Sequence, residues 1–406
     1  MGNLFENPEM RDAVIYEFTN SPYEALIYAD SLRFEKGNKT IGLVDQFQGK
    51  RPVVLNYDFA VLRKELQLGF VHTLIMDSHI VDALHRFVSG KGKQDEDSKF
   101  VVTQFLNHVS QIKCDYNPVF YMVENWAKSP EEVYLKTTSE KLTSLLTLHA
   151  MDEEVFLRSG EISLKQEAID YYFEKYDASS IEECALRWAE SLINVNAFDM
   201  YKKHTRLTYA CLLKMVLIHF LNPEVSEKNI IDKTHQFIKF LVEDLDIMLM
   251  REFSLAIYYF SNLAGRFLNI QPNMSYKKAA KNLRATAWDM LLLRLPEMLL
   301  EPSRLPEVNT SYIVTSEDKL LAVGELFNLE SLFYPNSQSF GTPALSTKSE
   351  NFDSKVSQEN LDLLFQELSQ LSFIRRQIDY DIKLDDSKVE WIINDLEHQL
   401  GHLCRG

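Results

Sequence analysis

Strand-like patterns of apolar residues fill the first part of the chain. Two short apolar runs, at residues 41–45 and 52–57, have the composition of β-strands, and the turn-forming segment 46–51 between them predicts a hairpin. A third run, residues 74–76, is short and entirely apolar. Such a run is typical of a strand that is buried in the centre of a sheet.

The third run is followed by an amphipathic helix pattern. Apolar residues recur at positions 80, 81, 84, 87 and 88, which is the spacing of one face of a helix packed on a sheet. The pattern ends at Ser89-Gly-Lys-Gly-Lys93, and the polar residues 94–99 continue the loop. This part of the chain therefore predicts a strand, a helix and a glycine-containing turn in succession.

Helical spacing dominates from about residue 100 to residue 300. One of these helices, residues 230–259, is rich in large apolar residues and is expected to be buried among the others. Pro296 is expected to end the last of them. The predicted helices cover residues 100–108, 117–128, 164–175, 181–195, 209–221, 230–259 and 275–295.

Beyond residue 300 the pattern changes twice. Residues 312–315 predict a strand and residues 319–326 a helix. The next segment, 334–357, is rich in Ser, Asn, Pro and Gly, which is typical of a flexible linker or an exposed loop. Residues 361–371 and 388–403 then predict a pair of helices.

Composition narrows the function only slightly. The chain has 406 residues and a formal net charge of −16, from 59 acidic and 43 basic residues. This balance argues against a broad nucleic-acid or membrane-binding surface but allows a local basic groove. The four cysteines are scattered, so neither a zinc cluster nor a disulfide framework is expected. Without a signal-peptide pattern or an apolar stretch that could span a bilayer, we expect a cytoplasmic protein with no membrane contact.

Isolated carboxylates are the most informative chemical feature. Asp77 ends the apolar run His72-Thr-Leu-Ile-Met-Asp-Ser78. Asp289 has no cation at helical neighbour positions, so no salt bridge on its own helix accounts for it. Glu317 and Asp318 lie where the predicted strand 312–315 meets the next helix. Because a carboxylate in apolar surroundings costs several kcal/mol unless it is compensated, these positions suggest one shared cation.

Each carboxylate also has a structural explanation. Ser78 is a good residue to cap the helix that follows Asp77. Glu317 and Asp318 would be stabilised by the helix dipole at the start of their helix. Asp289 would be satisfied by partial exposure or by a distant lysine. Strand-end carboxylates nevertheless lie where α/β sheets bind ligands.

The order of these motifs resembles the PIN-domain nuclease family. The resemblance rests on Leu74-Ile-Met-Asp-Ser78, on Ala287-Trp-Asp-Met-Leu-Leu292 and on Ile313-Val-Thr-Ser-Glu-Asp-Lys-Leu320. The family also has an acidic residue on a helix after the first strand, and Asn117-Pro-Val-Phe-Tyr-Met-Val-Glu-Asn125 matches that segment. The resemblance covers about a third of the chain, around residues 70–130 and 275–330.

This resemblance implies a set of metal-binding catalytic carboxylates, namely Asp77, Glu124, Asp289 and either Glu317 or Asp318. Glu124 has a structural alternative, an i,i+4 ion pair with Lys128. Asp246 and Glu252, in the helical segment, are alternatives for the second ligand. Glu317 occupies the Thr-x-Asp position, whereas Asp318 precedes a lysine as in Asp-Lys-x-Leu, so both stay candidates.

The implied chemistry is phosphodiester hydrolysis with Mg²⁺ or Mn²⁺. These cations prefer carboxylate and water oxygens, and they activate water and neutralise phosphate charge. Thr315 and Ser78 are expected to orient the ligands. The resemblance favours RNA over DNA as substrate, often single-stranded, and by analogy a role as a toxin or phage-defence (antiviral) effector.

Substrate binding would require positive charge near the acidic cleft. Lys277, Lys281 and Arg284 share one helix face at i, i+4, i+7 spacing, just before Asp289. We expect them to contact the phosphate backbone, with a solvated helix face as the alternative.

The expected fold is α/β but predominantly helical by residue count. A PIN-like central parallel sheet flanked by helices would carry a large all-helical insertion and a C-terminal helical appendage. The expected division is an N-terminal mixed extension at 1–70, a nuclease core at 71–130 and 275–330, a helical insertion at 131–274, a linker at 331–358 and a helical segment at 359–406.

Two functional hypotheses follow from this fold. The first is a PIN-like endoribonuclease whose helical insertion holds a partner, forms a dimer or gates the site. The second is a non-enzymatic helical scaffold with a degenerate PIN-like core, which the net charge of −16 and the amount of apolar helix favour.

Overall fold

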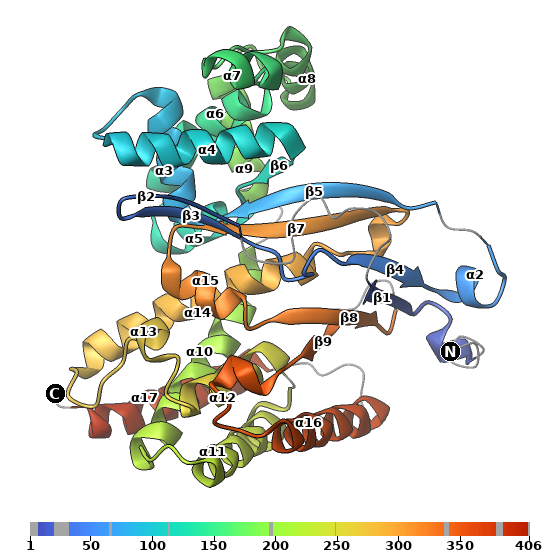
Figure 1. The fold of residues 1–406 in the computed structure, drawn as a ribbon, viewed down its shortest axis with the longest axis vertical. Coiled ribbons are helices and arrows are strands. Elements are labelled where there is room, and N and C mark those ends of the chain that lie inside the picture. Colours follow the sequence, from blue (N-terminus) through green and yellow to red (C-terminus); the bar gives the residue numbers. More distant parts are fainter. Residues whose placement is uncertain are drawn as a thin grey trace. The chain divides into compact units, whose positions relative to one another are not determined.

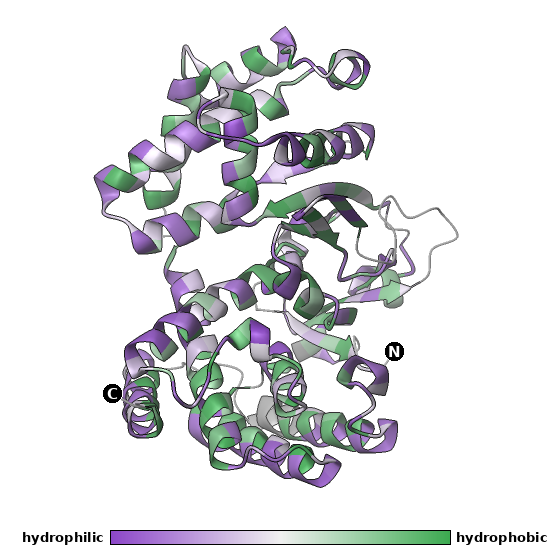
Figure 2. Cartoon of the chain, turned by 60° about the vertical axis from the view of Figure 1, so that its left-hand side comes forward, coloured by the Kyte–Doolittle hydropathy of each residue, from purple (hydrophilic) through white to green (hydrophobic). Residues whose placement is uncertain are grey.

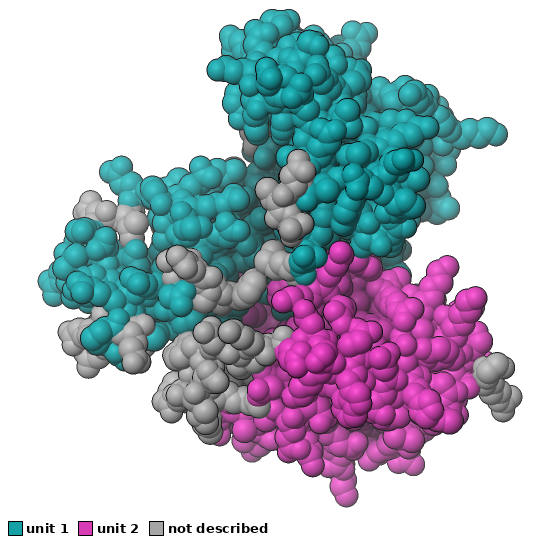
Figure 3. Space-filling view, turned by 180° about the vertical axis from the view of Figure 1, so that it is seen from behind, with its two compact units in different colours: residues 1–201, 292–321, 330–342 teal, residues 202–291, 322–329, 343–406 magenta. Residues whose placement is uncertain are grey.

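The fold is an α/β arrangement in which helices outnumber strands (Figure 1). It is a computed structural model, and it describes residues 7–19, 32–64, 67–112, 114–194, 198–247, 249–336, 341–378 and 385–404. The chain forms two compact units, which Figure 3 shows in different colours. Unit 1 comprises residues 1–201, 292–321 and 330–342, and unit 2 comprises residues 202–291, 322–329 and 343–406. The segment 131–274, expected as one insertion, is divided between them.

A five-stranded sheet forms the centre of unit 1. Its strands, in spatial order, are β2 (Leu32–Lys36), β3 (Lys39–Val44), β7 (Glu307–Thr315), β5 (Gly69–Met76) and β6 (Asp115–Asn117). The sheet is mixed, because β5 pairs parallel with both β6 and β7 whereas β3 pairs antiparallel with β2 and β7. The expected parallel sheet is therefore correct only for its β7-β5-β6 part. The expectation that residues 74–76 form a buried central strand is confirmed.

Seven helices of unit 1 follow β5 in the chain. Their bounds are α3 (Ser78–Ser89), α4 (Glu96–Ile112), α5 (Val119–Lys128), α6 (Glu131–His149), α7 (Glu153–Ser159), α8 (Gln166–Tyr176) and α9 (Ile181–Asn194). Of these, α3, α4 and α5 contact the strands of the sheet, while α6 packs on α3 and α9. Figure 1 shows this group of helices beside β5 and β2. Leu74, Ile75 and Met76 of β5 are completely buried.

Helix α3 begins and ends as its sequence predicts. Asp77 is the N-cap residue, and its side chain accepts a hydrogen bond from the backbone N–H of Ile80. Gly90 ends the helix in the left-handed conformation at φ 65°, which a residue without a Cβ adopts at little cost. The expectation that Ser78 caps the helix is wrong by one position, because Asp77 itself supplies the capping oxygen.

A smaller group of strands lies near the N-terminus. β1 (Val14–Thr19) pairs antiparallel with β4 (Arg51–Leu55) and with β8 (Asn328–Tyr334). The expected hairpin between residues 41–45 and 52–57 is wrong, since β3 belongs to the five-stranded sheet and β4 pairs with β1. The turn at Asp45–Lys50 thus passes the chain from one sheet to the other. A short helix, α2 (Tyr57–Ala60), follows β4.

Unit 2 is built mainly from helices. They are α10 (Phe198–Leu221), α11 (Glu227–Lys239), the π-helical turn η2 (Phe240–Leu245), α12 (Met250–Phe260), α13 (Gly265–Leu268), α14 (Tyr276–Met298), α15 (Asp318–Gly324), α16 (Gln358–Ile378) and α17 (Asp386–Leu403). The first residues of α10, the last turns of α14 and the start of α15 belong to unit 1. The expected C-terminal pair of helices is confirmed by α16 and α17. Figure 2 shows hydrophobic residues concentrated along these helices.

Two helix boundaries differ from the expectation. The single helix expected at 230–259 is interrupted, because η2 ends at Asp246, which adopts a left-handed φ of 58°. Helix α14 includes Pro296 and continues to Met298, so the proline lies in the last turn and does not stop the helix. Proline removes the hydrogen bond that its own nitrogen would donate and crowds the carbonyl four residues earlier, and α14 ends two residues after it.

The structure contains elements that the apolar pattern did not predict. They include β1, β2, β6, α2, α6, α7, α13 and the short 3-10 turns η1 (Pro8–Met10), η3 (Pro302–Arg304) and η4 (Ser349–Phe352). The segment expected as a flexible linker contains the end of β8, all of β9 (Thr342–Ser346) and η4. Among the described residues, none of the helices is both long and apolar enough to span a membrane.

Candidate functional site

The candidate site lies where β5 and β7 end. The two strands run parallel with Met76 paired to Val314, so their carboxyl ends meet at the same edge of the sheet. The backbone N–H of Asp77 donates to the carbonyl oxygen of Val314 at 3.0 Å, which extends this pairing by one residue. Asp77 and Thr315 are the residues at the ends of these strands. In α/β sheets this edge is where ligands bind.

Asp77 is the buried centre of the site. Only 5% of the residue is exposed. Its Oδ1 accepts a hydrogen bond from the Ile80 N–H at 2.8 Å, and its Oδ2 accepts one from the Thr315 hydroxyl. Burial raises the pKa of the Asp77 carboxyl, and the hydrogen bond from Thr315 opposes that shift. The local structure thus holds a carboxylate in apolar surroundings with few compensating contacts.

Glu317 joins the same cluster through Thr315. The Glu317 backbone N–H donates to Thr315 Oγ1 at 3.1 Å, so the threonine hydroxyl links the two acidic residues. Glu317 Oε1 lies 3.4 Å from His79 Nε2, and Oε2 lies 3.1 Å from Lys319 Nζ. Its contact with His79 lowers the pKa of Glu317 to about 2, and the same contact raises the pKa of His79 to about 9. His79 is therefore cationic at neutral pH.

Glu124 approaches from α5. The Ser78 hydroxyl, one residue after Asp77, donates a hydrogen bond to Glu124 Oε2. Glu124 Oε1 also lies 2.6 Å from Lys128 Nζ, the i,i+4 ion pair considered from the sequence. Its side chain is only 15% exposed. Both interpretations of Glu124 thus describe contacts that exist: it neighbours Asp77 through Ser78, and it pairs with Lys128.

Three carboxylates consequently gather around two hydroxyl groups. Asp77 and Glu317 share Thr315, and Glu124 is bound to Ser78 beside them. Within the described ranges of the chain, however, no three His, Cys, Asp or Glu side chains converge closely enough to hold a metal ion. In this arrangement protein cations occupy the positions around Glu124 and Glu317.

The remaining candidate ligands are Asp318 in unit 1 and three acidic residues in unit 2. Asp318 begins α15 with its side chain 80% exposed, and its Oδ1 is 4.0 Å from Arg33. Asp289 lies on the part of α14 that belongs to unit 2 and is half-buried. Asp246 and Glu252 also belong to unit 2. Glu252 is fully buried and accepts a hydrogen bond from Thr208 at 2.5 Å, which gives it a structural role within that unit.

The expected substrate-binding residues are all in unit 2. Lys277, Lys281 and Arg284 are exposed on α14. Arg284 forms an ion pair with Glu397 at 2.6 Å and lies over the ring of Tyr209. Its charge is thus already compensated, whereas the two lysines remain exposed on the helix surface. The alternative of a solvated helix face fits this part of α14.

Two polar residues near the sheet ends were missed by the sequence interpretation. His79 was not among the predicted site residues, yet it forms the ion pair with Glu317 described above. Asp45 is 6% exposed and accepts hydrogen bonds from the N–H groups of Phe47 and Gly49. Burial raises the pKa of Asp45 to about 7. The signal available for His79 was its position, two residues after the strand-end residue Asp77. The signal for Asp45 was the Gln48-Gly49 turn that follows it in the chain.

Comparison with known proteins identifies no relative of this chain. No protein-family model, curated protein or solved structure matches the chain.

Proposed function

We propose that the chain is a metal-dependent endoribonuclease of PIN-like type that cleaves single-stranded RNA. The observation that carries the proposal is the buried carboxylate of Asp77 at the joined carboxyl ends of β5 and β7, tied through hydroxyl groups to Glu317 and Glu124. Perturbed carboxyl groups of this kind gather at functional sites. The neighbouring parallel strands β7, β5 and β6 support the PIN-like part of the proposal.

The donor chemistry of the cluster suits Mg²⁺ or Mn²⁺. Asp77, Glu124 and Glu317 offer only oxygen atoms, and each carboxylate has more lone pairs than its present hydrogen bonds occupy. When bound, such a cation supplies an activated water and neutralises charge on the scissile phosphate. Lys128, His79 and Lys319 occupy these carboxylates here, so we expect metal binding to compete with them.

The residues of the chain itself would perform three tasks. Thr315 and Ser78 fix the orientation of the carboxylates by donating hydrogen bonds to them. The protonated ring of His79, which is 67% exposed, offers a positive charge to a phosphate at the rim. The burial of Asp77 keeps water from its side chain, which strengthens its interaction with any cation.

The remaining expectations are part of the same proposal. Asp289, Lys277 and Lys281 belong to unit 2, and their roles as a metal ligand and as RNA contacts stay predictions from the sequence resemblance. A partner protein or a second copy of the chain would bind the helical segment. A cytoplasmic toxin or antiviral defence role would follow from nuclease activity.

The proposal is tested with purified full-length protein and end-labelled single-stranded RNA and DNA. We expect cleavage of RNA with Mn²⁺ or Mg²⁺ that chelation abolishes and that D77N reduces by at least about 100-fold, as for the loss of one essential electrostatic group. The matched control is D170N, at an exposed position of α8 in the same unit. Absence of metal-dependent cleavage by the unaltered protein, or full cleavage by D77N, would refute the nuclease.

A second pair of variants separates the two candidates for the last ligand. Because Glu317 is tied to Thr315 and Asp318 is exposed beside Arg33, we expect E317Q to lose cleavage and D318N to retain it. The reverse result would assign the role to Asp318.

One observation favours the alternative of a non-enzymatic scaffold. Glu124 and Glu317 are already paired with protein cations, and the described residues form no metal-binding group. On that hypothesis, isothermal titration with Mn²⁺ should show no binding, and D77N should leave every partner interaction unchanged.

A further inference from the structure

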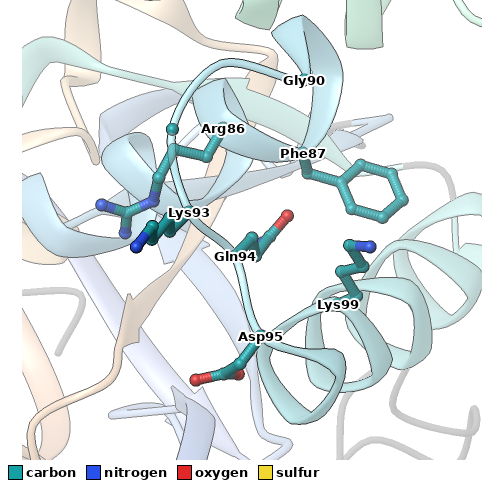
Figure 4. A pocket seen from close by; sticks show the side chains of 8 residues that line it. Arg86, Phe87, Gly90, Lys93, Gln94, Asp95 and Lys99 are labelled. Carbon is teal, nitrogen blue, oxygen red and sulfur yellow. The ribbon is translucent and has the colours of Figure 1, made fainter.

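A hollow of about 620 Å³ lies between the end of α3 and the start of α4 (Figure 4). Arg86 and Phe87 of α3, Lys93 and Gln94 of the loop, and Lys99 of α4 line it. All of these residues belong to unit 1. The sequence interpretation treated this loop, Ser89-Gly-Lys-Gly-Lys93, only as the end of a helix.

The hollow carries excess positive charge in an acidic protein. Figure 4 shows the side chains of Arg86 and Lys93 projecting on the same side of the loop. Neither forms an ion pair with any described carboxylate. Asp95, the acidic residue of the lining, is 3.4 Å from Lys39 and also accepts a hydrogen bond from the Ser98 N–H at 2.7 Å. The carboxylate of Asp95 is thus occupied by Lys39 and by the Ser98 N–H.

The hollow also contains an unsatisfied donor. Gln94 Nε2 is buried from solvent and has no hydrogen-bond acceptor among the described residues. A buried donor of this kind is destabilising unless an acceptor reaches it. Two cations and a free N–H donor around one cavity therefore favour an acceptor that carries negative charge.

The loop backbone and the ring of Phe87 indicate which kind of anion fits the hollow. Gly90 and Gly92 have left-handed φ values of 65° and 88°, and a Cβ at Gly92 would lie 3.4 Å from the Arg86 side chain. Glycine at these positions keeps the entrance free of side chains. Phe87 supplies an apolar ring beside the charges. Arginine and lysine beside an aromatic ring suit a phosphate that is attached to a base.

Helix α3 connects this hollow to the candidate site. Asp77 caps its first turn and Gly90 ends its last, so its 12 residues separate the two by about 18 Å. His79, Ala83 and Arg86 lie at i, i+4, i+7 positions and form one stripe along the helix.

We propose that the hollow formed by Arg86, Lys93 and Gln94 is a phosphate-binding subsite for a single-stranded nucleic acid, at the opposite end of α3 from the candidate site. This proposal rests on the nuclease function for the identity of the ligand. Arg86 and Lys93 neutralise the phosphodiester, Gln94 donates its hydrogen bond and Phe87 stacks on a base. The subsite is a binding element and takes no part in the chemical step.

Binding is measured by fluorescence anisotropy in the D77N background, where no cleavage disturbs the equilibrium. With a labelled RNA of about ten nucleotides, we expect R86Q/K93Q to weaken binding about 10-fold and to reduce the salt slope by about 1.4, or 0.7 for each lost phosphate contact. R86K/K93R should restore most of the affinity. K136Q/K228Q removes the same charge at exposed positions of α6 and α11 and should leave binding nearly unchanged.

The outcomes separate this inference from the nuclease proposal. If the unaltered protein cleaves RNA but R86Q/K93Q binds RNA as D77N alone does, the subsite is wrong and the nuclease stands. If no cleavage occurs but R86Q/K93Q still weakens binding of the labelled RNA, the subsite stands and the nuclease is wrong. Inorganic pyrophosphate is the second probe: its binding at Arg86 and Lys93 without any binding of the strand would overturn the assignment to a nucleic acid.

Discussion

Thr315 donates its hydroxyl hydrogen to the buried carboxylate of Asp77, although 238 positions separate the two residues in the chain. The same oxygen accepts the N–H of Glu317. T315V keeps the shape of the side chain but removes both contacts. We expect a loss of about 1–3 kcal/mol in the free energy of unfolding, because Asp77 Oδ2 would be left buried without a donor. Urea unfolding at neutral pH measures this change.

Thr310 provides the control for that substitution. It lies on the same strand, is buried, and its hydroxyl forms no hydrogen bond to another described residue. T310V should therefore change stability by less than about 0.5 kcal/mol. Equal losses for T310V and T315V would mean that strand packing, and not the bond to Asp77, accounts for the effect.

We expect the ionised carboxylate of Asp77 to lower the free energy of unfolding, although it serves the proposed function. Burial raises its pKa, so the folded protein binds a proton more tightly than the unfolded chain does. The free energy of unfolding therefore falls as pH rises from the ordinary aspartate pKa of 3.8 through the raised value. Asparagine is an equally good N-cap residue and carries no charge. We expect D77N to unfold at the same or a higher urea concentration at pH 8, while metal-dependent cleavage is lost.

The pH dependence of the same variant gives the check. The difference in unfolding free energy between D77N and the unaltered protein should shrink as pH is lowered, because the protonated Asp77 carboxyl is also neutral. A D77N protein that is markedly less stable at every pH would contradict this account of Asp77 as a functional residue held at a cost.

Local elements were the most predictable part of the fold. The apolar run 74–76, the 3.6-residue spacing after Ser78 and the glycine at position 90 defined β5 and α3 correctly, since each depends only on neighbouring residues. The hairpin between residues 41–45 and 52–57 was wrong because strand pairing depends on distant partners. Pro52 pairs with Phe18 of β1, a strand that no local pattern identified.

The candidate site was predictable in type but not in its contacts. A strand-end aspartate and a Thr-x-Glu motif indicated a carboxylate cluster, and the parallel register of β5 and β7 brings Asp77 and Thr315 together. The choice between Glu317 and Asp318 depends on how the chain turns after Thr315, which the sequence does not define. The ion pair of His79 with Glu317 depends on the same turn.

A substitution at Gly42 tests how closely Leu321 of α15 packs against β3. Gly42 pairs with Thr315 across β3 and β7, and a Cβ at this position would lie 2.5 Å from Leu321 Cδ2. Leu321 is completely buried. Replacing glycine by alanine in a strand gains about 0.4–1 kcal/mol by restricting the unfolded chain, whereas overpacking costs about 1–3 kcal/mol. We expect G42A to be destabilised, as measured by urea unfolding.

A double-mutant cycle identifies the cause. If Leu321 is the obstacle, L321A should cost less stability in the G42A protein than in the unaltered one, with a coupling of at least about 0.5 kcal/mol. Additive effects of the two substitutions would show that the close approach of Leu321 does not limit the space at Gly42.

The ion pair between His79 and Glu317 predicts a stability maximum in mildly acidic solution. The pKa of His79 rises from 6.5 to about 9, so its contribution is complete below pH 6.5 and is lost as pH rises through 9. The pKa of Glu317 falls from 4.5 to about 2, so its contribution is present above pH 4.5 and is lost as pH falls through 2. Together the pair stabilises the fold most between pH 4.5 and 6.5.

H79Q isolates this contribution. The His79 ring is 67% exposed, so solvent screening limits the effect to no more than about 1 kcal/mol. We expect the unaltered protein to exceed H79Q in unfolding free energy at pH 6 and to lose that advantage as the pH approaches 10. Because the contact is an ion pair, high salt should reduce the difference at pH 6. A difference that stays constant from pH 6 to pH 10 would mean that His79 acts by packing and that its contact with Glu317 carries no charge.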